Sequence, residues 1–236
     1  MKYFGKEFLF SFTLLICIST YAQTKGTMTD PRDGQVYKTV EIGNQTWMAQ
    51  NLNYESTDSI FYKKFIKPLS MLNQFGVYIP DSYCYGGVLI NCEKYGRLYH
   101  YEAAMKACPI GWHLPDSSDY NSLLVHLNKA VGYDKYKLYQ SLLPGGSSGF
   151  DIIFGGAGSS LTDNLRGHYG GRPDELYLWV SDTTKFTNSK NILTDVHSRN
   201  AVYLFFWLRR KSYVRCKYHV INKYWLFSVR CIKDEE

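Results

Sequence analysis

The cysteines restrict the fold of this chain more than any other feature of its sequence. One of the six, Cys17, lies in an apolar leader and follows Ile16, which is bulkier than lipidation signals normally accept. The others are Cys84, Cys92, Cys108, Cys216 and Cys231. None of them forms a CxxC pair, so their spacing excludes zinc-ribbon and thioredoxin-like sites. In an oxidising compartment, they predict a disulfide framework with one cysteine left over.

Residues 1–22 predict that such a compartment is reached. Lys2 and Lys6 precede an apolar run over residues 8–18, and small residues lead to a predicted cleavage after Ala22. The run is too short to remain as a transmembrane helix, and no later segment approaches about 18 consecutive apolar residues. We therefore expect a signal peptide and an exported mature protein with no transmembrane segment.

One disulfide is suggested by local spacing alone. Cys84 and Cys92 enclose a segment whose Gly86-Gly87 pair suits a tight turn. A bridge between these two cysteines is the simplest pairing, and the chain-entropy model assigns it roughly 2.6 kcal/mol of stabilisation.

The first half of the mature chain predicts a hairpin, an insertion and two helices. Residues 30–54 alternate with period two between turn signals, and residues 55–82 show no clear period. A helical face over residues 101–108 ends at Pro109. A second helix over residues 116–131 begins at Asp116 as its cap. We expect residues 23–82 to form the N-terminal hairpin and insertion, and residues 83–236 to form the core.

The second half predicts loops and strands. Helix formers are sparse beyond residue 135, which favours strands there. Glycine is dense over residues 143–175, which indicates a long loop region. Aromatic and β-branched residues predict strands over 177–184, 200–208, 212–220 and 224–233. The expected class is α+β, with two helices packed on antiparallel strands.

No catalytic constellation emerges from the sequence. Gly145-Gly146-Ser147-Ser148-Gly149 fits the GxSxG pattern, but no strand–turn–helix context surrounds it, so we expect a loop. Cys108 and His113 suggest a nucleophile and its base, yet disulfide use outranks reactivity in an exported chain. The histidines form no HExxH motif. We expect no enzyme activity, no metal and no cofactor.

The charge of the chain is modest. The net charge is +6, and removal of the leader lowers it by one. Many basic residues fall within 209–217, where we expect solvated positions of an exposed hairpin. The absence of a basic helix and of a binding motif argues against nucleic acid as a partner.

Four blocks of sequence carry a resemblance to a known family. They are TDPRDGQVYKTVEIGNQTWMAQNLNY, KYGRLYHYEAAMKACPIGWHLP, LWVSDTT and LFSVRCIKD, which lie within residues 29–234. Together they resemble the Fibrobacter succinogenes major paralogous domain, a family of exported bacterial proteins. The residues 55–82 are longer than the family pattern, and Trp179-Val180-Ser181-Asp182-Thr183 departs mildly from it.

The resemblance implies a C-type lectin-like fold in which the last strand is bridged back to the first helix. Here that pairs Cys108 with Cys231, for which the chain-entropy model gives about 4.9 kcal/mol. Cys216 is then left over, either as a buried free thiol or as a partner for another molecule. The resemblance also places Trp112 and Trp179 in the core. It implies a protein that is secreted, periplasmic or at the cell surface of a Gram-negative bacterium.

The family has no established activity to transfer, so the candidate site rests on the residues themselves. A lectin-type calcium site needs oxygen donors. The run Arg172-Pro173-Asp174-Glu175 has an arginine at its first position, where such a site requires an oxygen donor. Loops on a rigid scaffold usually carry recognition, and aromatic rings can stack on sugars. The candidate ligand-binding residues beside the glycine-rich loops are Tyr169, Arg172, Asp174 and Tyr177.

Two functions follow as expectations. The first is an exported, non-enzymatic binding module that recognises a glycan or protein through residues 145–178 without calcium. The alternative is a structural or assembly component of the cell envelope that self-associates through Cys216 or an exposed strand of the 200–220 hairpin.

Overall fold

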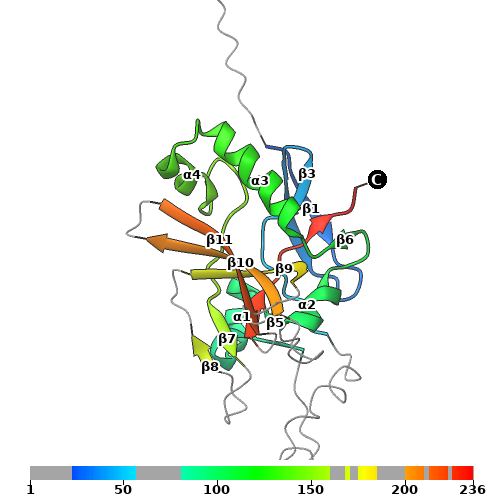
Figure 1. The fold of residues 1–236 in the computed structure, drawn as a ribbon. Coiled ribbons are helices and arrows are strands. Elements are labelled where there is room, and N and C mark those ends of the chain that lie inside the picture. Colours follow the sequence, from blue (N-terminus) through cyan, green and yellow to red (C-terminus); the bar gives the residue numbers. More distant parts are fainter. Residues whose placement is uncertain are drawn as a thin grey trace, which may run out of the picture.

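In the part of the chain that the structure describes, two β-sheets and four α-helices form an α+β fold (Figure 1). The computed structural model describes residues 23–56, 81–159, 168–170, 175–184, 200–209, 213–222 and 225–235. The predicted signal peptide and most of the 55–82 insertion lie outside the described residues, as do Arg172 and Asp174.

The smaller sheet has five strands and contains the predicted hairpin. Its order is β1 (Lys25–Thr29), β2 (Val36–Ile42), β3 (Gln45–Met48), β13 (Ile232–Lys233) and β6 (Trp112–His113), with all neighbours antiparallel. Gly43 has a φ of 66° in the turn between β2 and β3, a conformation that glycine adopts without a steric penalty. The period-two pattern of residues 30–54 therefore predicted this hairpin correctly.

The larger sheet has eight strands and holds the predicted C-terminal strands. Its main path runs β11 (Tyr213–Asn222), β10 (Asn200–Arg209), β9 (Glu175–Thr184), β12 (Trp225–Ser228), β5 (Leu98–His100) and β4 (Ser82–Tyr83). A hairpin of β7 (Ala157–Ser159) and β8 (His168–Gly170) pairs with β12. The named strands pair antiparallel except β9 and β12, which are parallel.

Both predicted helices are present. Helix α2 (Tyr101–Ala107) ends just before Cys108 and Pro109, as the proline predicts. Helix α3 (Ser117–Ala130) begins with a capping box between Asp116 and Asp119. In Figure 1, α3 runs beside α4 at the top of the view, and α4 lies next to β11.

Two further helices were not predicted. Helix α1 (Leu89–Tyr95) follows a 3₁₀ turn, η2 (Tyr85–Gly87); it begins within the small disulfide loop and continues past Cys92. Helix α4 (Lys135–Leu142) occupies residues where strands were expected, and that expectation was wrong. The side chain of Asp134 accepts hydrogen bonds from the backbone N–H groups of Tyr136 and Lys137, so a cap and a buried face outweigh weak helix propensity.

The last predicted strand, residues 224–233, is divided between the two sheets. Strand β12 lies between β9 and β5 in the larger sheet, and β13 lies between β3 and β6 in the smaller one. Val229, Arg230 and Cys231 join them and are fully buried. Leu52 N–H donates to Val229 O at 2.8 Å, and Met48 N–H donates to Cys231 O at 3.1 Å. Residues 225–233 therefore supply one inner strand to each sheet.

Arg230 donates hydrogen bonds to three acceptors around the segment that joins β12 to β13. Its guanidinium donates to the carbonyl of Phe150, to Asp151 O at 3.2 Å and to Asn51 Oδ1 at 3.0 Å. It also lies 4.5 Å from the centroid of the Phe150 ring, over its face. Burial lowers the pKa of Arg230 to about 10, which still leaves it charged at neutral pH.

Both predicted disulfide pairings are confirmed. Cys84 is bridged to Cys92, and Cys108 is bridged to Cys231. The interpretation of Cys108 as a bridged anchor rather than a nucleophile therefore holds. Trp179 is fully buried and Trp112 packs half-buried against the same hydrophobic cluster as Cys231.

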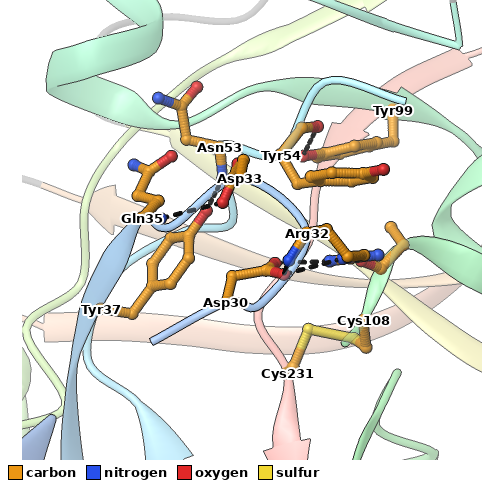
Figure 2. Close-up of polar contacts among 11 residues, drawn as sticks. Asp30, Arg32, Asp33, Gln35, Tyr37, Asn53, Tyr54, Tyr99, Cys108 and Cys231 are labelled. Carbon is orange, nitrogen blue, oxygen red and sulfur yellow. Dashed lines mark hydrogen bonds and ion pairs between the residues drawn. A yellow bond between two sulfur atoms is a disulfide. The ribbon is translucent and has the colours of Figure 1, made fainter. Parts of the chain in front are cut away.

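A second clamp lies beside the Cys108–Cys231 bridge (Figure 2). Arg32 donates to the carboxylate of Asp30 at 2.6 and 2.9 Å and to Ala107 O, at the end of α2, at 2.7 Å. Its guanidinium carbon lies 3.7 Å above the ring of Tyr54. Burial raises the pKa of Asp30, but the hydrogen bonds and charge of Arg32 outweigh it, so that pKa lies below its usual value. The turn after β1 is thereby fixed to α2.

The two disulfides close loops of different length, and this difference predicts how much each one stabilises the folded protein. Cys108→Ala opens a loop with a sequence separation of 123, worth about 4.9 kcal/mol in the chain-entropy model. Cys84→Ala opens one with a separation of 8, worth about 2.6 kcal/mol. Denaturant unfolding should show the larger loss for Cys108→Ala. In that variant Cys231 should react with a thiol reagent in denaturant without reductant, and an unreactive Cys231 contradicts the pairing.

His100 predicts a loss of stability at mildly acidic pH. Burial lowers the pKa of His100 in the folded protein to about 4, against 6.5 for an unperturbed histidine. The unfolded chain therefore binds a proton first as the pH falls, and the folded state loses about 3 kcal/mol between pH 6.5 and 4. Unfolding free energies measured across this window should flatten in His100→Phe, which keeps a ring without a titratable nitrogen. An unchanged slope in that variant would contradict the assignment.

Candidate functional site

The glycine-rich region expected to carry recognition is divided between two places in the fold. Its first part, residues 143–149, packs on the C-terminal end of α4. Its last part enters β8 and β9, where Tyr169 pairs with Gly158 of β7 and Tyr177 lies next to β12. The predicted residues Arg172 and Asp174 lie outside the described residues. Of the four candidates, Tyr177 alone has a described side chain.

Tyr177 belongs to a row of aromatic rings. Its ring is stacked on that of Phe227, with centroids 5.0 Å apart and planes at 14°. The ring of Trp225 lies 6.0 Å from Phe227 at 30°. Phe227 is fully buried, whereas Tyr177 and Trp225 are half-buried. Tyr177 and Trp225 are thus partly exposed, and both pack against the buried ring of Phe227.

A carboxylate completes this group. The hydroxyl of Tyr177 donates to Glu175 Oε2 at 2.9 Å, and the two residues point to the same side of β9 because they are two positions apart. Glu175 is half-buried and so retains contact with solvent. We call Glu175, Tyr177, Trp225 and Phe227 the aromatic edge.

Sequence reasoning did not select Glu175 and Trp225 for the site. The period-two spacing of Trp225 and Phe227 was visible, but it does not say which strand lies beside them. The parallel pairing of β12 with β9, in which Ser228 is opposite Leu178, brings Trp225 toward Tyr177. That pairing joins residues far apart in the sequence and could be found only in the fold.

A hollow of about 500 Å³ lies between α3, α4 and the turn at residues 144–148. We call it the α4 groove. Gly146 permits the close approach of this turn, because a Cβ there would lie 2.4 Å from the carbonyl oxygens of Gln140 and Ser141. The hydroxyl of Ser148 donates to Ser141 O at 2.5 Å and fixes the turn to the helix. The GxSxG sequence is therefore a loop that follows a helix, as expected.

A polar hollow of about 640 Å³ lies near the C-terminus, where His113 bridges two carboxylates. Its Nδ1 is 2.6 Å from Asp234 Oδ1, and its Nε2 is 3.5 Å from Asp119 Oδ2. The same Asp119 oxygen accepts the N–H of Asp116 in the capping box of α3. This histidine therefore ties β6, α3 and the C-terminal segment together.

The described residues contain no cluster of three or more histidine, cysteine, aspartate or glutamate side chains placed to hold a metal ion. Among the helices in the described part of the chain, none has the length and apolar character needed to cross a bilayer.

Comparison with known families identifies the chain. The model of the Fibrobacter succinogenes major domain matches residues 40–233. This range includes both disulfides, the aromatic edge and the α4 groove. No curated protein and no solved structure matches the chain at a significant level. Because the match covers most of its length, the chain belongs to the Fibrobacter succinogenes major domain family.

Proposed function

We propose that this protein is an exported, non-enzymatic binding module of C-type lectin-like fold. It recognises a glycan or protein at the surface of a Gram-negative cell without calcium, and the aromatic edge is its contact surface. The observation that carries this proposal is the half-buried Tyr177, held by Phe227 below it and by Glu175 at its hydroxyl, with Trp225 alongside.

The arrangement suits recognition for physical reasons. A ring fixed by stacking and by a hydrogen bond loses little conformational entropy when a ligand binds. Aromatic side chains offer a large apolar contact area, and a tyrosine adds a polar end. The Glu175 carboxylate accepts the Tyr177 hydroxyl and so fixes the orientation of this polar end.

Export and the lectin-like fold are supported by separate observations. The leader at residues 1–22 has the organisation of a signal peptide, and two disulfides suit an oxidising compartment. The bridge from the end of α2 to the last strand supports the lectin-like arrangement. Arginine at the first position of Arg172-Pro173-Asp174 supports recognition without calcium.

A glycan array tests the proposal when it is probed once with calcium and once with chelator. We expect selective binding that survives chelation and falls by about tenfold or more in Tyr177→Ala, the range of an interface hot spot. Tyr177→Phe keeps the ring and should lose less. Ile110→Ala, at a residue 96% exposed, is the control for a surface change elsewhere. Binding that needs calcium, or that survives in a folded Tyr177→Ala variant, contradicts the proposal.

A second function has one observation in its favour. Strand β11 is ten residues long and is the terminal strand of the main path of the larger sheet, pairing in the described part of the chain with β10 alone. Cys216 lies within it, opposite Phe206. An edge strand presents backbone donors and acceptors to another chain, so the alternative is an envelope assembly component that self-associates through β11.

Mass measurement without reductant tests this alternative. Self-association through Cys216 predicts a covalent dimer that disappears in Cys216→Ala. Pairing of β11 edges alone predicts a dimer that persists in Cys216→Ala and depends on concentration. A purely monomeric protein at high concentration in both states excludes the alternative.

A further inference from the structure

We propose that the α4 groove is a second ligand site, which binds a sugar that carries a carboxylate, such as a uronic acid unit. This site is separate from the aromatic edge and does not depend on the function proposed for it. The argument rests on the shape of the groove, on an exposed aromatic ring at its rim and on the side chains that line it.

The groove has firm walls. Helix α4 forms one side, and the turn at residues 144–148 is fixed to it by the hydrogen bonds of Ser148 to Ser141 and by the close approach at Gly146. Its volume of about 500 Å³ lies within the range of roughly 300–1,000 Å³ for small-molecule sites. A short oligosaccharide therefore fits without rearrangement of the backbone.

An aromatic ring is available for stacking at the rim. Tyr136 lines the groove, is 56% exposed, and has its ring 6.3 Å from that of the buried Tyr139. Tyr133, in the turn before α4, is 69% exposed and has a φ of 60°, a conformation that is costly for a bulky residue. The strained turn at Tyr133 thus places a second aromatic ring in solvent, next to the first residues of α4.

Two polar side chains that line the groove can meet a ligand. Among the described contacts, the side chains of Gln140 and Ser147 make no internal hydrogen bond, and both residues are exposed. An amide and a hydroxyl supply donors and acceptors for sugar hydroxyl groups. Together with the face of the Tyr136 ring, these side chains match the apolar face and the polar edge of a pyranose ring.

The charge of the groove selects the class of sugar. Among the described residues that line it, Lys137 is the single charged one, and none carries a carboxylate. The nearby Asp134 carboxylate caps α4 through Oδ1, which accepts the N–H groups of Tyr136 and Lys137, and its charge also attracts that of Lys137. Among the described ion pairs within 4.0 Å, none involves the Lys137 ammonium group. An acidic ligand can therefore form a direct ion pair with it that a neutral sugar cannot form.

Calorimetric titration of the whole protein with tetragalacturonate and with its fully methyl-esterified form tests the site, because these probes have the same sugar units and linkages and the ester removes the charges. We expect tetragalacturonate to bind at least about tenfold more tightly and to weaken as salt rises from about 50 to about 300 mM. Tyr136→Ala and Lys137→Gln should each weaken it by about tenfold. Lys129→Gln removes an exposed lysine outside the groove and is the matched control.

Several results would overturn the site. They are equal affinity for the two probes, no binding of tetragalacturonate, and equal losses in Lys129→Gln and Lys137→Gln. Unchanged binding in Tyr136→Ala would also reject it. Because both altered side chains are exposed, unchanged melting temperatures should show that the variants fold. Tyr177→Ala should bind tetragalacturonate like the unaltered protein, so failure at the aromatic edge and failure at the groove give different patterns.

Discussion

Burial of the segment that joins β12 to β13 is the constraint on which the rest of the structure depends. Val229, Arg230 and Cys231 have no exposed surface, and each meets a different part of the chain. Val229 accepts from the backbone of Leu52, Arg230 holds residues 150–151, and Cys231 is bridged to Cys108. The guanidinium of Arg230 donates to Phe150 O, Asp151 O and Asn51 Oδ1, and these hydrogen bonds offset part of the cost of burying its charge.

Those parts of the fold that depend on local chemistry could be predicted from the sequence. The hairpin of β2 and β3 follows from alternation around Gly43, and the ends of α2 and α3 follow from Pro109 and Asp116. Helix α4 was missed because its propensity is weak and its stability comes from a cap together with the burial of Tyr139 and Leu142. The division of the last strand between two sheets has no local signal, because it is decided by pairing with strands that lie far away in the sequence, β9 for β12 and β3 for β13.

The candidate site could be predicted only in part for the same reason. Tyr177 was identified because it borders the glycine-rich loops, but its stacking partner Phe227 lies on β12, which a parallel strand pair places beside β9. The groove was not foreseen at all, since it needs a helix that the sequence did not predict and a turn that only Gly146 allows. The aromatic edge and the α4 groove therefore both depend on tertiary contacts. The residue types that form them are common ones and do not mark a site in the sequence.

The place of β12 and β13 also determines when this chain can fold. A chain is made from its N-terminus, so β3, β5, β6 and β9 all exist before the strands that pair with them as inner neighbours. Neither sheet has its full set of strands until residues 225–233 have been synthesised, and contacts of such long sequence separation form slowly. Loss of these residues would remove an inner strand from each sheet, whereas loss of β1 would remove one edge strand from the smaller sheet.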